Sequence, residues 1–469
     1  MCLTPFIKKE DLNPIYLQIY QYFREKIENG ELSAGTKLPS IRQLSQSTNV
    51  SKNTVELAYQ QLVAEGYIEG REKKGLFVLK LDDYQFPIGE NISRTTLKYQ
   101  KDEKIEKKFI DFHYGDIDLE HFPHKTWKKC LVDALEIPSQ EVFSYGNKKG
   151  HLGLRNEIVQ YLFQARGVQC SPDQIVLTAG TQIATQLLCQ LLSLRNNRVA
   201  LENPGYDGVR HVFESQQCKI KPVSLKEDGI CIEELENSSA RCAYVTPSHQ
   251  FPMGMVLPIQ KRIKLLQWAE ENSSYIIEDD YDGEFRYQGQ PIPSLKSLDT
   301  NGNVIYLGTF SKAFLPAARV SYLVLPEKLL ERFQSEFNFY NQAVSPFIQE
   351  ALFQLMKNGH FNRHIRKMRK IYQSKQKVLL EAIRKFLGED VQVIGQKAGL
   401  HLLLNFNKND PINLVKQAEK LGVKIYLTEP YWYQKTSGSN QPIIIGFGGL
   451  SEADIQAGIQ KLAIALKKY

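Results

Sequence analysis

One lysine stands among residue types that could carry covalent chemistry. The segment from 306 to 326 reads YLGTFSKAFLPAARVSYLVLP and contains Ser311, Lys312 and Arg319. A lysine amine can form a Schiff base with a carbonyl compound, and an arginine suits a bidentate phosphate contact. A single lysine is nevertheless more often a solvated surface charge. The interpretation therefore depends on the groups that accompany it.

A second segment supplies a carboxylate and a phenol at the end of an apolar run. The sequence IIEDDYDGEF places Asp279 and Tyr281 just after this run. Pyridoxal phosphate (PLP) acts as an electron sink only while its pyridine nitrogen stays protonated. A buried carboxylate beside that nitrogen raises its pKa, and a phenol nearby could bond the ring oxygen O3′. The simpler alternative is an acidic loop that caps a strand.

Two further turns could hold the rest of a flat, phosphorylated cofactor. The sequence VLTAGTQIATQLL places Gly180, Thr181 and Gln182 between a strand and a helix. Backbone donors at a helix N-terminus, together with a hydroxyl, are suited to a phosphate. The sequence LENPGYDGVR places Tyr206 after another strand, where its ring could stack on a cofactor. Each motif alone is weak, since many α/β turns resemble the first and core packing explains the second.

These motifs follow short apolar runs that alternate with helical patterns from about Phe109 to the end. The alternation predicts an α/β domain with a mainly parallel sheet. From about Pro346 the pattern changes to long helices, followed by a smaller α+β unit. The apolar runs span 175–177, 198–201, 243–245, 275–277, 304–307 and 322–325.

The first 81 residues follow a different plan of three helices and two short strands. An amphipathic helix is predicted over 16–29 from the spacing of Ile19, Tyr20, Phe23 and Ile27. A second helix follows Pro39 and Ser40. Ser51 is a suitable N-cap for a third, over 52–65, and Gly66 a suitable C-cap glycine. Strands are predicted at 67–69 and 76–78, which completes a winged helix-turn-helix.

Polar and basic residues of this module lie where such a fold meets DNA. A recognition helix places its N-terminal residues at base edges and phosphates, and a basic wing suits a groove. The alternative is a solvated face of a small helical domain. The predicted contacts are Ser40, Arg42, Ser51, Lys52, Asn53, Thr54, Arg71, Lys73, Lys74 and Gly75.

Composition, charge and cysteine spacing limit the domain organisation and the class of protein. A polar segment over 82–108 predicts a linker between a domain at 1–81 and another at 109–469. The net charge of +7 permits an anionic partner without requiring one. Seven scattered cysteines lack metal-ligand spacing, so free thiols and no metal site are expected. With neither a signal peptide nor a long apolar run, a cytoplasmic protein without membrane contact is expected.

The motifs carry a resemblance over nearly the whole chain. Residues 34–78 resemble the GntR-type winged helix, and the later segments resemble fold-type I aminotransferases. Together they resemble the MocR/GabR family of regulators, which joins these two domains. The most specific stretches are TPSHQFPMG (246–254), IIEDDYDGEFRY and GTFSKAFLPAARVSYLVLP. The resemblance implies a DNA-binding transcription regulator that senses PLP itself, an amine or an amino acid.

The resemblance also implies roles for individual residues. Lys312 would form the internal aldimine, Asp279 would hold the pyridine nitrogen, Tyr281 would hold O3′, and Tyr206 would stack on the ring. It further implies a homodimer in which the winged helix of one chain lies against the large domain of the other. The residues implied around the cofactor phosphate are Gly180, Thr181, Gln182, Thr309, Ser311 and Arg319.

One position departs from the aminotransferase pattern, and two depart from that of a regulator in the resembled family. Ile444 stands where an aminotransferase carries the arginine for the substrate carboxylate. Gly208 and Gly449 stand where the family member that senses γ-aminobutyrate has arginines. Arg210 and His401 are nearby candidates for another anion contact. A sensor is therefore favoured, while an active aminotransferase with an accessory DNA-binding module and a purely dimerising domain stay as alternatives.

Overall fold

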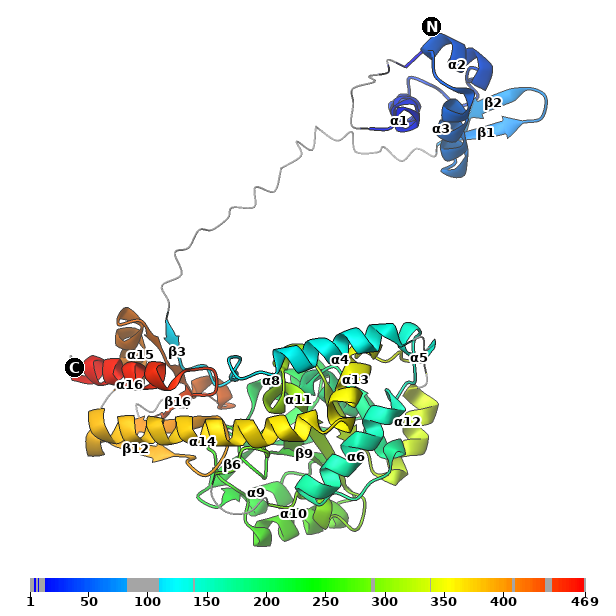
Figure 1. Ribbon diagram of the computed structural model, residues 1–469. Coiled ribbons are helices and arrows are strands. Elements are labelled where there is room, and N and C mark those ends of the chain that lie inside the picture. The colour runs from blue at the N-terminus through cyan, green and yellow to red at the C-terminus, as the bar shows by residue number, and fades with distance from the viewer. Residues whose placement is uncertain are drawn as a thin grey trace. The chain divides into compact units, whose positions relative to one another are not determined.

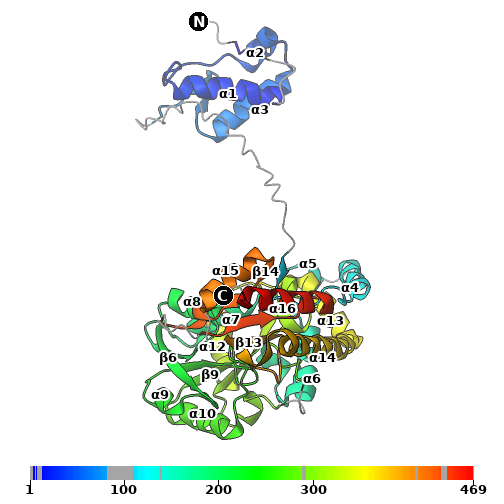
Figure 2. The same cartoon turned by 90° about the vertical axis from the view of Figure 1, so that its left-hand side faces the viewer.

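The computed structural model describes residues 4–5, 7, 13–81, 109–137, 140–287, 292–337, 339–406, 410–434 and 441–467. The chain divides into two compact units, Met1–Ile105 and Glu106–Tyr469, and each is described by itself (Figures 1 and 2). The predicted linker at 82–108 and Cys2 lie outside the described residues. The predicted domain boundaries therefore stay predictions.

The N-terminal unit has the predicted helices and wing. Helix α1 buries the four expected side chains, and its Phe23 meets Tyr59 of α3 edge-on, with ring centroids 5.7 Å apart. Ser51 caps α3 as expected, and Gly66 follows it with a φ of +74°, a conformation that glycine adopts easily. The elements are α1 (Ile15–Glu28), α2 (Ile41–Thr48), α3 (Lys52–Ala64), β1 (Ile68–Arg71) and β2 (Gly75–Val78).

The large unit contains an eight-stranded sheet in the order β4-β11-β10-β9-β8-β5-β6-β7. The neighbours β10, β9, β8, β5 and β6 run parallel, whereas β11 is antiparallel to β10 and β4. The bounds are β4 (Ile175–Thr178), β5 (Arg198–Asn203), β6 (Lys219–Lys226), β7 (Gly229–Ile230), β8 (Cys242–Val245), β9 (Tyr275–Asp280), β10 (Val304–Thr309) and β11 (Ser321–Val324).

Helices cover both faces of this sheet, and the alternation of side chains along each strand decides which face a residue serves. On β10, for example, Tyr306 packs with α4, α6 and α13, whereas Ile305 and Leu307 pack with α7, α8 and α12. Helices α9 and α10 extend the first layer. The bounds are α4 (His124–Glu136), α6 (Leu152–Arg166), α7 (Thr181–Leu191), α8 (Asp207–Ser215), α9 (Ile232–Glu236), α10 (Ile259–Glu271), α12 (Leu330–Phe337) and α13 (Pro346–Lys357).

The C-terminal part forms the smaller α+β unit that the sequence predicts. Helix α14 (His360–Phe386) runs from the large sheet to a four-stranded antiparallel sheet (Figure 1). The short strand β3 (Ile110–Asp111) pairs in parallel with β14 (Val423–Lys424). Residues at the start of the large unit therefore pack against its C-terminal part. The remaining elements are β12 (Val391–Ile394), β13 (His401–Phe406), α15 (Pro411–Lys420), β15 (Tyr426–Leu427), β16 (Ile443–Gly446) and α16 (Glu452–Lys467).

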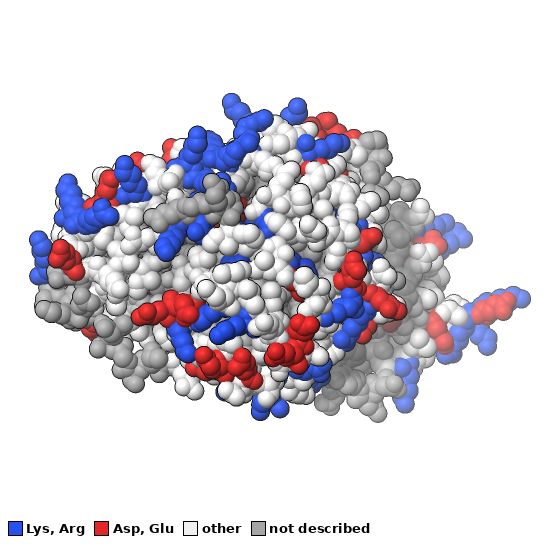
Figure 3. Space-filling view, turned by 90° about the horizontal axis from the view of Figure 1, so that it is seen from below, with Lys and Arg blue, Asp and Glu red and all other residues white. Residues whose placement is uncertain are grey.

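Surface charge, the cysteines and the length of the helices add three observations. On the face shown in Figure 3, side chains of both charges border a broad area without charge, so this face does not single out an anionic partner. The cysteines among the described residues are free, and none of the helices described is long and apolar enough to cross a membrane.

Candidate functional site

A cavity of about 260 Å³ lies where the parallel strands of the large sheet end. Ligands of open α/β sheets bind outside the carboxyl ends of the strands, because loops from several strands meet there. The cavity joins residues that follow β4, β5, β9 and β10. Its lining includes Tyr114, Thr181, Gln182, Tyr206, Phe251, Asp279, Tyr281, Thr309, Ser311, Lys312 and Arg319.

Lys312 lies in α11 (Phe310–Ala313), which starts directly after β10. Its Nζ donates a hydrogen bond of 2.6 Å to the carbonyl oxygen of Tyr114 and lies 5.3 Å from the centre of that ring. Burial lowers the pKa of Lys312 to about 8, against an opposing effect from the charges of Asp282 and Asp116. The neutral, nucleophilic form of this amine is therefore far more populated near physiological pH than for an ordinary lysine, although the charged form is still the majority.

Asp279 lines the cavity and has one carboxylate oxygen without a partner. The phenol of Tyr244 on the adjacent strand β8 donates to Oδ2 of Asp279. The other oxygen, Oδ1, is buried and has no hydrogen-bond partner. Burial raises the pKa of Asp279 to about 7. A buried oxygen without a partner is costly, so this atom is suited to a ligand that brings a proton.

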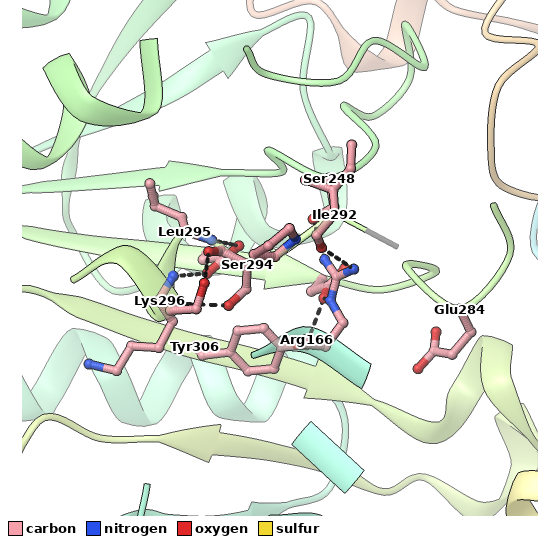
Figure 4. A network of polar contacts seen from close by, with 12 residues as sticks. Arg166, Ser248, Glu284, Ile292, Ser294, Leu295, Lys296 and Tyr306 are labelled. Carbon is pink, nitrogen blue, oxygen red and sulfur yellow. Dashed lines mark hydrogen bonds and ion pairs between the residues drawn. The ribbon is translucent and has the colours of Figure 1, made fainter. Parts of the chain in front are cut away.

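The acidic residues Glu278, Asp279 and Asp280 do not simply cap a loop. They lie in strand β9, and their side chains alternate between its two faces. Glu278 accepts hydrogen bonds of 2.7 Å from the backbone N–H groups of Leu295 and Lys296. Asp280 accepts from Tyr306 at 2.6 Å and pairs with Arg166 at 2.6 Å. Figure 4 shows these two partners, Tyr306 and Arg166, together with Leu295 and Lys296. These two carboxylates fix the strand to its covering layer, and Asp279 alone of the three lines the cavity.

Tyr281 is held by a short polar chain that starts on another loop. Its phenol donates to the carbonyl oxygen of His249 at 3.0 Å. His249 Nδ1 lies 2.9 Å from Oδ2 of Asp282, so this ring nitrogen donates to the carboxylate. Both His249 and Asp282 are buried. The chain fixes the direction of the Tyr281 ring, which lines the cavity.

The part of the cavity around Gly180 and Arg319 has the features of a phosphate cradle. Gly180 precedes α7 with a φ of +97°, and a Cβ at this position would clash with Nη2 of Arg319. Arg319 itself has a φ of +51°, a strained conformation for a non-glycine residue. The Thr309 hydroxyl accepts from the backbone N–H of Ser311 at 3.2 Å. Backbone donors, hydroxyls and a guanidinium therefore converge here.

These features fit PLP. The partnerless Oδ1 of Asp279 suits a protonated pyridine nitrogen, Lys312 offers an amine, and the glycine cradle beside Arg319 suits a phosphate. Tyr206, at the start of α8, meets Phe251 edge-on with centroids 5.7 Å apart, and it lines the same cavity. The cofactor residues singled out from the sequence are thus brought together.

The positions considered for a carboxylate contact are packed against neighbouring side chains, bonded to backbone carbonyls or buried in a strand. A Cβ at Gly208 would lie 2.6 Å from the Tyr206 ring, and one at Gly449 would lie 2.8 Å from Cβ of Asp116. Both guanidinium NH2 groups of Arg210 donate to backbone carbonyls, those of Pro430 and Trp432. Ile444 is buried in β16.

His401, the other candidate for an anion contact, is also engaged. Its Nε2 donates to the carbonyl oxygen of Pro252 at 3.1 Å. Burial lowers the pKa of His401 to about 3, so the ring is neutral and offers no positive charge to an anion.

The predicted DNA contacts lie on α2, α3 and the wing. Their exposed members are Ser40, Arg42, Ser51, Lys52, Asn53, Arg71, Lys73, Lys74 and Gly75, and Thr54 is half-buried. The Ser40 and Ser51 hydroxyls accept from Gln43 and Thr54 N–H groups, so they cap their helices. Arg71 is paired with Glu69 at 2.8 Å and lies over the Phe77 ring. The other cations of this set project into solvent.

Sequence reasoning missed several neighbours of the cofactor residues. Tyr244 meets Asp279 only because β8 pairs with β9, and Tyr114 meets Lys312 across 198 positions of chain. His249 lies in the stretch TPSHQFPMG, which stood out in the sequence without an assigned role. That stretch was the available signal.

Comparison with known proteins defines the class. Residues 107–436 match the model of aminotransferase class I and II, a PLP-dependent class, and residues 15–78 match that of bacterial regulatory proteins, gntR family. The structure is similar to kynurenine aminotransferase from Pyrococcus horikoshii, with a TM-score of 0.70 and 26% identity, covering 77% of this chain and 91% of that one. The predicted fold class is confirmed.

Relatives that align along the whole chain define the family. The chain is 42% identical over 472 residues to YdeL, an uncharacterized HTH-type transcriptional regulator of Bacillus subtilis (strain 168), covering 100% of both. It is 31% identical over 464 residues to the probable rhizopine catabolism regulatory protein MocR of Rhizobium meliloti, covering 96% and 94%. The protein belongs to the family of HTH-type transcriptional regulators, MocR among them, that join a GntR domain to an aminotransferase-like domain.

Proposed function

We propose that this transcription regulator holds PLP on Lys312 and changes its DNA binding when the large unit binds PLP or an amine. The observation that carries the proposal is the cavity, which joins a nucleophilic amine, a partnerless buried carboxylate oxygen and a phosphate cradle. When bound, PLP supplies an aldehyde that reacts reversibly with amines and an electron-withdrawing ring.

The residues of this chain have separate tasks in that proposal. Lys312 holds the cofactor through Nζ, and Asp279 keeps a proton on the pyridine nitrogen through Oδ1. Tyr281 orients the ring from O3′, and Tyr206 covers one ring face. The phosphate is held by Gly180, Thr181, Gln182, Thr309, Ser311 and Arg319.

Sensing is favoured over steady transamination by the charges of the cavity. Transamination of an α-amino acid needs a cation that holds the carboxylate while protons move. Among the described residues that line the cavity, Arg319 lies at the phosphate end and Lys312 is the cofactor amine. Steady turnover of an amino donor with a keto acceptor would instead support the aminotransferase alternative.

The winged helix supplies the DNA contact. Its recognition helix α3 starts with Lys52, Asn53 and Thr54, and the wing exposes Lys73 and Lys74. We propose that these residues, with the caps Ser40 and Ser51 and with Arg42, Arg71 and Gly75, meet base edges and phosphates of an operator.

A homodimer would match paired half-sites of that operator, because two-fold symmetry repeats the winged helix at a fixed spacing. Exposed large apolar side chains offer surface that a second copy of the chain could cover. Among the described residues, Phe143, Tyr145 and Phe339 have 63%, 76% and 87% of their surface exposed. The exchange of winged helices between partners is part of the same proposal.

The experiment is a DNA-binding titration of the full-length protein with and without PLP, repeated with a panel of amines and amino acids. We expect the operator affinity to change by at least about fivefold with PLP or one amine, a typical size for coupling between sites. The Lys312→Ala variant should bind the operator without this response. DNA affinity that never changes with any of these ligands would overturn the sensor proposal.

A further inference from the structure

Tyr114, Phe251 and Tyr431 form an aromatic cluster, and Tyr114 and Phe251 of this cluster line the cavity beside Lys312. The centroids of Tyr114 and Phe251 are 5.0 Å apart, those of Phe251 and Tyr431 are 4.8 Å apart, and those of Tyr114 and Tyr431 are 6.1 Å apart. The Lys312 ammonium already lies 5.3 Å from the centre of the Tyr114 ring. Faces of aromatic rings attract cations, and a cluster of rings is a common site for an ammonium.

Two carboxylates lie near this cluster in the chain, since Asp116 is two residues from Tyr114 and Asp207 follows Tyr206. Asp116 stands beside a second, larger cavity that shares Gly115 and Pro316 with the cofactor cavity, so the two spaces adjoin. About half of the Asp116 side chain, 54%, is exposed. Asp207 begins α8 beside Tyr206. Burial chiefly, and then the negative charge of Asp207, raise the pKa of Tyr431.

Positive charge at this end of the site is already engaged. Among the described residues that line the adjoining cavity, the Lys375 ammonium is bound to Asp118 at 2.6 Å and to the Gly448 carbonyl at 3.0 Å. The His113 ring, which carries a positive charge only when protonated, lies with Nδ1 3.1 Å from Oδ1 of Asp116. The space that a side chain at Gly449 would need is filled by Asp116.

We infer that the amine ligand of this site carries a second cationic group and lacks a carboxylate, with the second cation bound between the aromatic rings and Asp116. A diamine has this chemistry. An amino acid would place its carboxylate against Asp116, where like charges repel. The inference rests on the proposed function, because the first amine is the one that meets the cofactor.

The test compares three ligands of similar length on the full-length protein loaded with PLP: diaminobutane, butylamine and aminobutanoate. Affinity is measured by calorimetry, and the absorption spectrum of the cofactor is recorded in parallel. We expect diaminobutane to bind about tenfold more tightly than the other two, from one cation–π contact and one partly exposed ion pair.

Variants of Asp116 test whether this carboxylate causes the preference for diaminobutane. Asp116→Asn should remove the preference for diaminobutane, and Asp116→Arg should shift it toward aminobutanoate. Glu214→Gln is the matched control, since Glu214 lies 3.1 Å from His211 in the same three-residue spacing on exposed surface. This control should keep the wild-type preference.

The outcomes separate the inference from the proposed function. Equal or tighter binding of aminobutanoate by the wild type, or a preference that survives Asp116→Asn, would overturn the inference. A normal cofactor spectrum that no amine perturbs, without heat of binding, would overturn it while leaving the cofactor site intact. If no cofactor spectrum forms at all, the proposed function fails and the inference fails with it.

Discussion

Tyr244 and Asp279 stand on neighbouring strands, and the phenol of the first donates to Oδ2 of the second while Oδ1 stays buried without a partner. The contact holds one oxygen of the carboxylate, and Asp279 lines the same cavity as Lys312. This pair gives the cavity a preformed acceptor, which distinguishes it from an ordinary crevice of an α/β sheet.

Replacing Asp279 by Asn should weaken PLP binding by roughly ten- to hundredfold, because the variant cannot offer a charged acceptor to the pyridine N–H. Tyr244→Phe should have a smaller effect, since it frees the carboxylate to turn but keeps its charge. Cofactor affinity can be measured by equilibrium titration of fluorescence. Equal affinity of Asp279→Asn and wild type would exclude the assigned role.

The attachment of PLP to the cofactor-free protein should depend on the pKa of Lys312, which burial lowers from 10.5 to about 8. Only the neutral amine is nucleophilic, so the attachment rate should rise with pH and level off above about 8. Stopped-flow absorbance across this range measures the rate. A rate that continues to climb toward the ordinary lysine value of 10.5 would contradict a perturbed lysine.

Arg319→Gln should lower the affinity for PLP by at least about tenfold and leave the affinity for pyridoxal, which has no phosphate, nearly unchanged. Gly180→Ala should act in the same direction, because its Cβ would displace the Arg319 guanidinium and its φ of +97° would be strained. An equal loss for both ligands would show that Arg319 serves the fold and not the phosphate.

Substitution of Lys52 or Lys73 by Ala should reduce the slope of log affinity against log salt by about one for each phosphate that the variant no longer binds. Fluorescence anisotropy with operator DNA at several salt concentrations gives this slope. Lys26→Ala is a suitable control, since Lys26 is already paired with Glu31 outside the predicted contacts. A slope unchanged by either substitution would remove that lysine from the interface.

Much of the fold was predictable because its signals are local. Apolar runs marked six strands of the large sheet, and capping residues such as Ser51 marked helix ends. Strand β6 was missed because KIKPVSLK is polar near the sheet edge and contains Pro222, which is unusual in a strand. The antiparallel β11 was predicted as a strand, but its direction depends on the connection after Lys312 and not on its residues.

The main residues of the site were predictable from the sequence, whereas the residues that contact and position them were not. Lys312, Asp279 and Tyr281 stand in specific motifs, whereas Tyr114, Tyr244 and Asp116 come from positions whose local sequence carries no sign of the contact. Such partners depend on strand order and on the packing of the two ends of the large unit, which no single segment determines.

The most direct test of the cofactor site is the visible absorption spectrum of purified protein with PLP, recorded for wild type and Lys312→Ala and followed by addition of amines. We expect a cofactor band in the wild type that Lys312→Ala lacks and that one amine shifts without steady turnover. A wild-type spectrum identical to that of free PLP would contradict the assignment of Lys312 and leave the large unit without its proposed cofactor.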